Sequence, residues 1–169
     1  MTHYEKGDYD RAIADHSQAI RLDPAYADAY HNRGLAYRAK GDLNRAIADF
    51  SEALRLNPRD ADAVSNRGFA YSRLGDGQSA IADFTESIRL DPTSAKTYRR
   101  RGMEYAGLGR LDMCICDLSE AIRLSPSSGQ LYYLRSVAYE GTGDLAKANE
   151  DREKALNLDP SLAKYKPKE

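Results

Sequence analysis

A period of 34 residues runs through this sequence from one end to the other. Proline marks the period most clearly, at Pro24, Pro58, Pro92, Pro126 and Pro160. Glycine repeats with the same spacing, at Gly7, Gly41, Gly75, Gly109 and Gly143. An internal repeat of this length predicts a chain made by stacking one small structural unit on the next, because each unit alone is too small to enclose a core.

Each repeat is predicted to form two helices joined by a tight turn. In the stretch "YADAYHNRGLAYRAKGDLNRAIADFSEALRLNP" the apolar residues recur at spacings of three and four, the period of a helix with one buried face. Gly41 can take the left-handed conformation that ends a helix, and Asp42 can cap the next one. Pro58 disfavours helical backbone in the residue before it, so the second helix is expected to end there. The small residues Gly34 and Ala46 let the two helices approach closely.

The repeated columns resemble the tetratricopeptide repeat (TPR) family, whose unit is a 34-residue helix–turn–helix. Position 1 of the four full units is taken as Ala27, Ala61, Ala95 and Gly129. The family's small residue at position 8 then falls on Gly34, Gly68, Gly102 and, as a departure, Ser136, and its aromatic at position 4 on Tyr30, Val64, Tyr98 and Tyr132. The resemblance implies an all-α fold, a right-handed α-solenoid of antiparallel helix pairs, in which the first helix of each unit lines a concave groove.

The same register divides the chain into units. The expected divisions are a truncated first unit at 1–26 that is mainly its second helix, full units at 27–60, 61–94, 95–128 and 129–162, and a stub of a further helix at 163–169. Met1 falls at position 9 of the first unit, either as a cut inside a longer array or as a start that leaves an open end. That open edge is expected to expose Ala12, Ile13 and Ile20 and to invite pairing with a second copy.

The C-terminal end is expected to be a finished surface. The last unit carries Asn149 and Arg152 where the other units have isoleucine and mostly aromatic residues. A more polar second helix suits a face that no further repeat covers, since solenoids protect their ends with polar surfaces.

Composition excludes several classes of function. The chain has 25 basic and 26 acidic residues and a formal net charge of −1, so a general basic field for nucleic acid is absent. No apolar run approaches the roughly 18 residues that cross a bilayer, so no membrane partner is expected. Cys114 and Cys116 point about 200° apart on a helix and are poor disulfide partners. A cytoplasmic location is favoured over a secreted one, and an upstream signal in a longer parent chain is left open.

The sequence contains no recognisable catalytic, cofactor or metal motif. His3, His16 and His31 have no cysteine or serine partner in a known arrangement. Each glycine belongs to a turn or packing column and not to a phosphate-binding loop. We therefore expect no enzyme activity, no cofactor and no metal site.

Two charged columns recur in the repeats and predict ion pairs. Position 7 is arginine in all four full units, at Arg33, Arg67, Arg101 and Arg135. Position 23 is aspartate in the same units, at Asp49, Asp83, Asp117 and Asp151. We expect the two columns to meet between first and second helices, within a unit or across neighbours, because the planar arginine fork can bind a carboxylate through two hydrogen bonds.

The run "RRR" at 99–101 departs from the repeat in its first two members. Lys96 and Arg100 lie four residues apart and so share a helix face. Some TPR proteins bind a free carboxylate through a five-residue clamp, and its last three slots map onto Asn66, Lys96 and Arg100. The first two slots map onto His31 and Leu35, and both depart from the clamp. The alternatives are therefore a carboxylate or acidic-peptide site and a merely solvated basic face.

Position 9 carries an apolar stripe, which either packs between adjacent first helices or offers pockets to a peptide. The candidate peptide-binding residues are Asn66, Lys96, Arg99, Arg100, His31, Asn32, Leu35, Arg38, Phe69, Arg73, Met103 and Tyr133. The leading hypothesis is a non-enzymatic protein–protein interaction scaffold that binds a peptide or protein partner, with an acidic or carboxylate-ended segment favoured. The alternative is a structural segment of a larger, bacterial-type TPR protein that forms a homodimer through its N-terminal edge.

Overall fold

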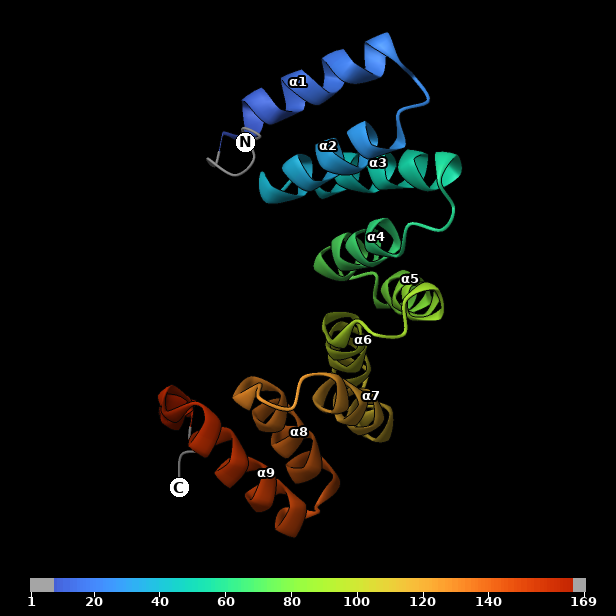
Figure 1. Ribbon diagram of the computed structural model, residues 1–169. Helices are drawn as coiled ribbons and strands as arrows, with labels where there is room; N and C mark the ends of the chain where they lie inside the picture. The colour runs from blue at the N-terminus through green and yellow to red at the C-terminus, as the bar shows by residue number, and fades with distance from the viewer. Residues whose placement is uncertain (1–7, 166–169) are drawn as a thin grey trace. The chain divides into compact units, whose positions relative to one another are not determined.

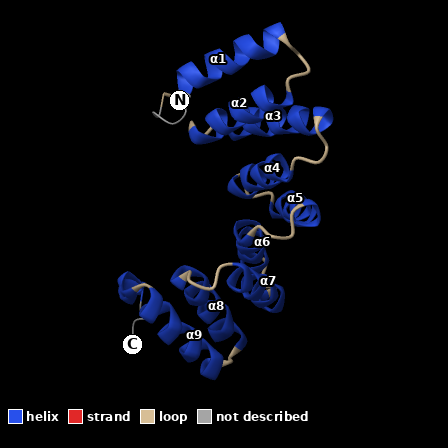
Figure 2. Cartoon of the chain, viewed as in Figure 1, coloured by secondary structure: helices blue, strands red, loops and turns tan. Residues whose placement is uncertain are grey.

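The computed structural model describes residues 8–165, which form α-helices, one 3₁₀ helix and no strand (Figure 2). The predicted all-α class is confirmed. The helices are α1 (Tyr9–Leu22), α2 (Ala27–Ala39), α3 (Leu43–Leu56), α4 (Ala61–Arg73), α5 (Gly77–Leu90), α6 (Ala95–Gly107), α7 (Leu111–Leu124), α8 (Gly129–Thr142) and α9 (Leu145–Leu158), followed by the 3₁₀ helix η2 (Pro160–Tyr165).

The chain divides into two compact units, Met1–Pro92 and Thr93–Glu169. In the first unit, α2 pairs with α3 and α4 pairs with α5, while α1 packs on α2 and α3 packs on α4 (Figure 1). In the second unit, α6 pairs with α7, α8 pairs with α9, and α7 packs on α8. Within each unit, helices that follow one another in the sequence therefore pack on one another, as a solenoid requires.

The turns inside each repeat follow the predicted chemistry. Gly41, Gly75 and Gly143 have φ of 84° and Gly109 has φ of 71°, a left-handed conformation that glycine adopts without strain. The next helix then begins with an aspartate cap in most repeats: Asp42 accepts a hydrogen bond from the Arg45 amide. Each second helix ends two residues before its proline, as α3 does at Leu56.

Aromatic and small residues form the contact between paired helices. Phe50 and Phe84 are fully or almost fully buried, at 0% and 1% exposure. A Cβ atom added at Gly34 would lie 2.9 Å from Phe50 Cε1, and one added at Gly68 would lie 3.0 Å from Phe84 Cε1. These positions therefore exclude side chains because the phenylalanine ring occupies the space.

The N-terminal edge differs from the prediction. Ala12 is only 2% exposed, so its expected exposure was wrong, while Ile13 and Ile20 are partly buried. Alanine projects little from the helix surface, and the packing of α1 on α2 leaves it covered. The predicted remnant of the first helix, 1–7, lies outside the described residues.

At the C-terminal end, the described part of the expected further helix is the 3₁₀ helix η2, which contacts α9 and α8. Asn149 is exposed, whereas Arg152 is partly buried and donates a hydrogen bond to Glu140 of α8. None of the helices in 8–165 is both long and apolar enough to cross a bilayer. The same residues contain no cluster of three or more acidic, histidine or cysteine side chains that could hold a metal ion.

Candidate functional site

The arginine and aspartate columns meet within each full repeat. Arg33 donates from Nε to Asp49 Oδ2 at 2.8 Å and from Nη2 to Asp49 Oδ1 at 2.7 Å. The same paired hydrogen bonds join Arg67 to Asp83, Arg101 to Asp117 and Arg135 to Asp151. The hydrogen bonds that Asp49 accepts raise the pKa of Arg33 above its ordinary value, and burial opposes this increase. The sequence left open whether these ion pairs form within a repeat or between neighbouring repeats, and the structure places all four within a repeat.

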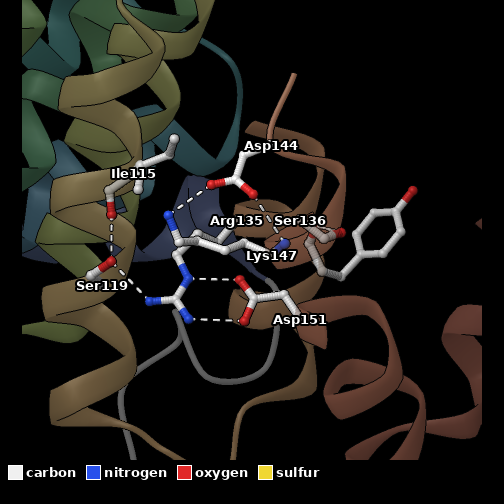
Figure 3. A network of polar contacts seen from close by, with 8 residues as sticks. Ile115, Ser119, Arg135, Ser136, Asp144, Lys147 and Asp151 are labelled. Atoms are coloured by element: carbon white, nitrogen blue, oxygen red, sulfur yellow. Dashed lines mark hydrogen bonds and ion pairs between the residues drawn. The ribbon is translucent and has the colours of Figure 1, made fainter. Parts of the chain in front are cut away.

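Three of these arginines, Arg33, Arg67 and Arg135, also bind a hydroxyl group of the preceding repeat. Arg135 Nη1 donates to Ser119 Oγ of α7 at 2.8 Å while its other nitrogens bind Asp151 of α9 (Figure 3). Ser17 and Ser51 play the same part for Arg33 and Arg67, at 3.0 Å and 3.2 Å. Each of these three arginines thus fastens three helices together, which makes it a structural brace.

This hydroxyl column was not predicted, although the sequence contains a signal for it. Ser17, Ser51, Thr85 and Ser119 are spaced by 34 residues, one place after the position that carries the buried aromatic. The stacking of aromatic rings on the brace was not predicted either: the Arg135 guanidinium lies 5.9 Å from the Tyr132 ring centre and 5.7 Å from that of Tyr139. These distances lie within the range of cation–π attraction.

In the first unit, the candidate residues hold one another in a polar chain. His31 Nδ1 lies 2.9 Å from Asp60 Oδ2, and His31 Nε2 lies 3.5 Å from the side-chain nitrogen of Asn66. Arg38 donates to Asn66 Oδ1 at 2.5 Å, and its guanidinium lies 5.5 Å from the centre of the Phe69 ring. Asn66 is only 8% exposed and has partners for both polar atoms. The hydrogen bond from His31 lowers the pKa of Asp60, an effect that burial opposes.

The remaining candidates of the first unit differ in accessibility. Asn32 and Arg73 are exposed, whereas Leu35 and Phe69 are partly buried. The apolar stripe at position 9 therefore contributes to packing in this unit, and Arg38 covers Phe69 further.

The second unit presents a different helix face. Lys96, Arg99, Arg100 and Met103 occupy places i, i+3, i+4 and i+7 of α6 and so share one side of that helix. Met103 is 42% exposed, and Val137, the next member of the apolar stripe, is 46% exposed on α8. Tyr133, the last candidate, is partly buried on α8. Cations and accessible apolar groups therefore lie together here.

A pocket of about 180 Å³ opens beside this face. Lys96 and Arg99 of α6 line it together with Ser125 and Ser128 of the loop after α7 and Gln130 of α8. Every lining residue is neutral or basic, so the pocket favours a negatively charged group. The clamp mapped onto Asn66, Lys96 and Arg100 draws on residues of both units and stays a prediction.

Comparison with known proteins agrees with these repeats. Residues 2–41 and 34–75 match the family model described as "TPR repeat", and residues 61–94 and 129–162 match the one described as "Tetratricopeptide repeat", so the matches span well over half of the chain. A comparison with curated proteins finds no match.

Solved structures of similar architecture include a crystal structure of MamA. MamA is 28% identical to this chain, with a TM-score of 0.88, and the match covers 96% of this chain and 95% of the MamA chain. MamA 41-end from Desulfovibrio magneticus RS-1 is 21% identical, with a TM-score of 0.87 and coverage of 94% and 89%. YrrB is 24% identical, with a TM-score of 0.80 and coverage of 93% and 81%. The last two likenesses show the fold alone. With the repeat signatures, braces and turns in the same register, the chain belongs to the tetratricopeptide repeat family.

Proposed function

We propose that the chain is a non-enzymatic scaffold that binds an acidic or carboxylate-ended peptide segment on the exposed faces of its first helices. The TPR fold is typical of protein–protein interaction scaffolds, which supports the general class. The YrrB structure is described as a TPR protein with an unusual peptide-binding site. At 24% identity that likeness concerns the fold, so the proposal depends on the residues of this chain.

The observation that carries the proposal is the face of α6. Three cations and the exposed Met103 share that face, and Val137 adds a second exposed apolar side chain on α8. Cations attract an acidic segment, and apolar groups gain by covering each other from water. The helices fix these side chains before binding, which lowers the entropy lost on association. His31, Asn32, Leu35, Arg38, Asn66, Phe69 and Arg73 are proposed to extend the surface in the first unit.

A selection from a random peptide library tests the proposal, followed by titration of the selected peptides. We expect enrichment in Asp and Glu, and an affinity that falls with added salt, since screening weakens exposed charges. The variant Lys96→Glu/Arg100→Glu should bind at least about tenfold more weakly, equivalent to about 1.4 kcal/mol. The matched control is Arg59→Glu/Lys154→Glu, which reverses two exposed charges elsewhere.

Two outcomes would reject this function. The first is the selection of peptides without acidic enrichment. The second is equal affinity of the wild type and the Lys96→Glu/Arg100→Glu variant. A loss of affinity that also occurs in the Arg59→Glu/Lys154→Glu control would show a general charge effect and would also count against the site.

A second candidate function is self-association through α1. Leu22 is 78% exposed, although the equivalent Leu56 and Leu90 are partly buried. Ile13 and Ile20 of α1 are also partly exposed, and exposed apolar side chains favour contact with a second copy. Light scattering after size-exclusion chromatography tests this: dissociation of a dimer by Leu22→Asp would support it, and a wild-type monomer at high concentration would reject it.

A further inference from the structure

Two places in the molecule occupy equivalent positions of the repeat but differ in charge. At the first junction, side chains of α2 lie beside the start of α4, and at the second junction, side chains of α6 lie beside the start of α8. The pocket residues Lys96, Arg99 and Ser128 each lie 68 residues, or two repeats, after Asp28, His31 and Asp60. At the first junction, Asp60 caps α4 by accepting a hydrogen bond from the Ala63 amide at 2.8 Å. Its other carboxylate oxygen lies 2.9 Å from His31 Nδ1. The chain itself therefore supplies a carboxylate to the side chain at position 5.

At the second junction, this internal carboxylate is missing. Ser128 replaces the aspartate and makes no capping hydrogen bond through its side chain. Arg99 replaces the histidine, and its side chain has no hydrogen bond or ion pair within 8–165. The two neighbouring aspartates of the first junction, Asp28 and Asp62, are replaced by Lys96 and Gln130. At the first junction, the donor at position 5 is His31, which binds the carboxylate of Asp60. At the second junction, the equivalent donor is Arg99, which is longer and permanently charged.

The pocket has the size of a functional group and not of a whole ligand. Its volume of about 180 Å³ is below the roughly 300–1,000 Å³ of pockets that enclose drug-sized molecules. A planar guanidinium binds a carboxylate through paired hydrogen bonds, and the lining hydroxyl and amide groups add further donors. This combination suits a small anion at the end of a flexible chain.

From these observations we infer that the pocket between α6 and α8 receives one carboxylate of the bound peptide, with Arg99 as its main ligand. The inference rests on the proposed function and deepens it, because it assigns one acidic group of the peptide to one set of residues. The carboxylate takes the place that Asp60 takes at the first junction. Lys96 of α6 adds a second positive charge to the lining, and Ser128 and Gln130 contribute polar groups.

Small probes test the pocket without a peptide. N-acetyl-aspartate amide, titrated into the ¹⁵N-labelled protein, should shift the amide signals of Ser128 and Gln130, and N-acetyl-asparagine amide should not. Arg99→Gln should lower the apparent affinity for the aspartate probe, obtained from these shifts, at least about tenfold. Arg59→Gln should leave this affinity unchanged. Inorganic phosphate serves as a third probe, and tighter binding of phosphate than of the carboxylate would overturn the assignment to a carboxylate.

A substitution that fills the pocket from within the chain gives the sharper test. Ser128→Asp recreates the aspartate of the first junction and should abolish the probe-induced shifts, because its carboxylate binds Arg99 first. Ser128→Asn is the matched control, since asparagine caps a helix as well as aspartate but carries no charge. Equal probe binding by the two variants would overturn the inference.

The same variants separate this inference from the function on which it rests. If selected peptides bind and Arg99→Gln leaves their affinity unchanged, the pocket assignment is wrong and the scaffold function stands. If the aspartate probe binds as expected but no peptide is selected, the pocket binds a carboxylate, and the proposed peptide-binding function is wrong. For peptides that do bind, amidation of the C-terminus and replacement of each acidic side chain by its amide identify which carboxylate occupies the pocket.

Discussion

The two units share one framework and differ in the chemistry that they present on it. In both, an arginine fork binds an aspartate between paired helices with distances of 2.7–2.8 Å, and a small residue faces the second helix. In the first unit, polar side chains of the first helices bind one another, as in the chain from Arg38 through Asn66 and His31 to Asp60. In the second, Arg99 points into an open pocket instead.

This difference separates the residues that build the repeat from those that can vary. Arg33 and Arg101 fall on the same repeat position and make the same contacts, so their role is set by the packing of the unit. Asp28 and Lys96 also share a position, yet their charges are opposite. Position 2 therefore accepts a side chain of either charge, because it is exposed and lies away from the contact between the helices. Positions of this kind can determine which partner is bound.

The largest expected effect tests whether the framework is equally important in both units. Asp49→Ala and Asp117→Ala should each lower the free energy of unfolding by about 3 kcal/mol, because each leaves a largely buried arginine without its carboxylate. Chemical denaturation followed by circular dichroism measures the loss. Glu120→Ala, which breaks the exposed pair with Arg123, is the control and should leave the midpoint almost unchanged. A large loss in one unit and none in the other would contradict the shared framework.

A smaller effect should distinguish the units at their glycines. Gly68→Ala places a methyl group 3.0 Å from the Phe84 ring and should destabilise the protein by about 1–3 kcal/mol. Gly102→Ala meets Asp117 Cβ at 3.3 Å and Leu118 only at 3.6 Å, so its loss should be smaller. Gly107→Ala has open space around the new methyl group and should be neutral or stabilising. Thermal unfolding of the three variants gives the order, and the reverse order for Gly68 and Gly102 would show that the backbone relaxes around the aromatic ring.

The fold was predictable from the sequence because the residues that form the turn and the helix contacts recur at the same positions of the repeats. Gly41 and Asp42 specify the turn by local chemistry alone, and the structure gives the expected left-handed φ and capping hydrogen bond. Repetition also identifies Arg33 and Asp49 as residues that serve the unit. The exposure of Ala12 was mispredicted because an open edge was taken to expose a whole column, whereas the actual exposure depends on which neighbour covers each side chain.

The candidate site was less predictable because it depends on departures from the repeat. A position that breaks a column, such as Arg99, has no internal copy from which its partner can be inferred. The role of Asn66 illustrates the problem: its residue type fits a carboxylate clamp, but its amide is already bonded to Arg38. Only the three-dimensional contacts reveal that His31 and Asp60 form the counterpart of the pocket at Arg99.

The counterpart itself predicts a pH dependence in the first unit. Because His31 lowers the pKa of Asp60, the charged carboxylate stabilises the folded state above its ordinary pKa, and this stabilisation is lost as the pH falls through the lower folded value. Asp60→Asn keeps a helix cap but loses this charge, so it should cost about 1 kcal/mol at pH 7 and less in acid. Urea denaturation at pH 7 and below pH 4 measures the difference. Ser128→Asn should show no such pH dependence, and an equal response of the two variants would contradict the contrast between the junctions.

The smallest expected effect concerns the two ends of the array, where position 24 is polar: His16 in the first repeat and Arg152 in the last. Burial lowers the pKa of His16, so its neutral form stabilises the folded state above the ordinary value of 6.5, and this stabilisation is lost as the pH falls through the folded value. His16→Phe, which restores the residue found at Phe50 and Phe84, should remove this loss, with a change in Tm between pH 7 and pH 5 of about 1 °C. Arg152→Leu is the matched variant, and it should show no change in pH dependence because arginine stays charged throughout. An unchanged acid response in His16→Phe would mean that another group titrates in this window and that the two ends differ only in packing.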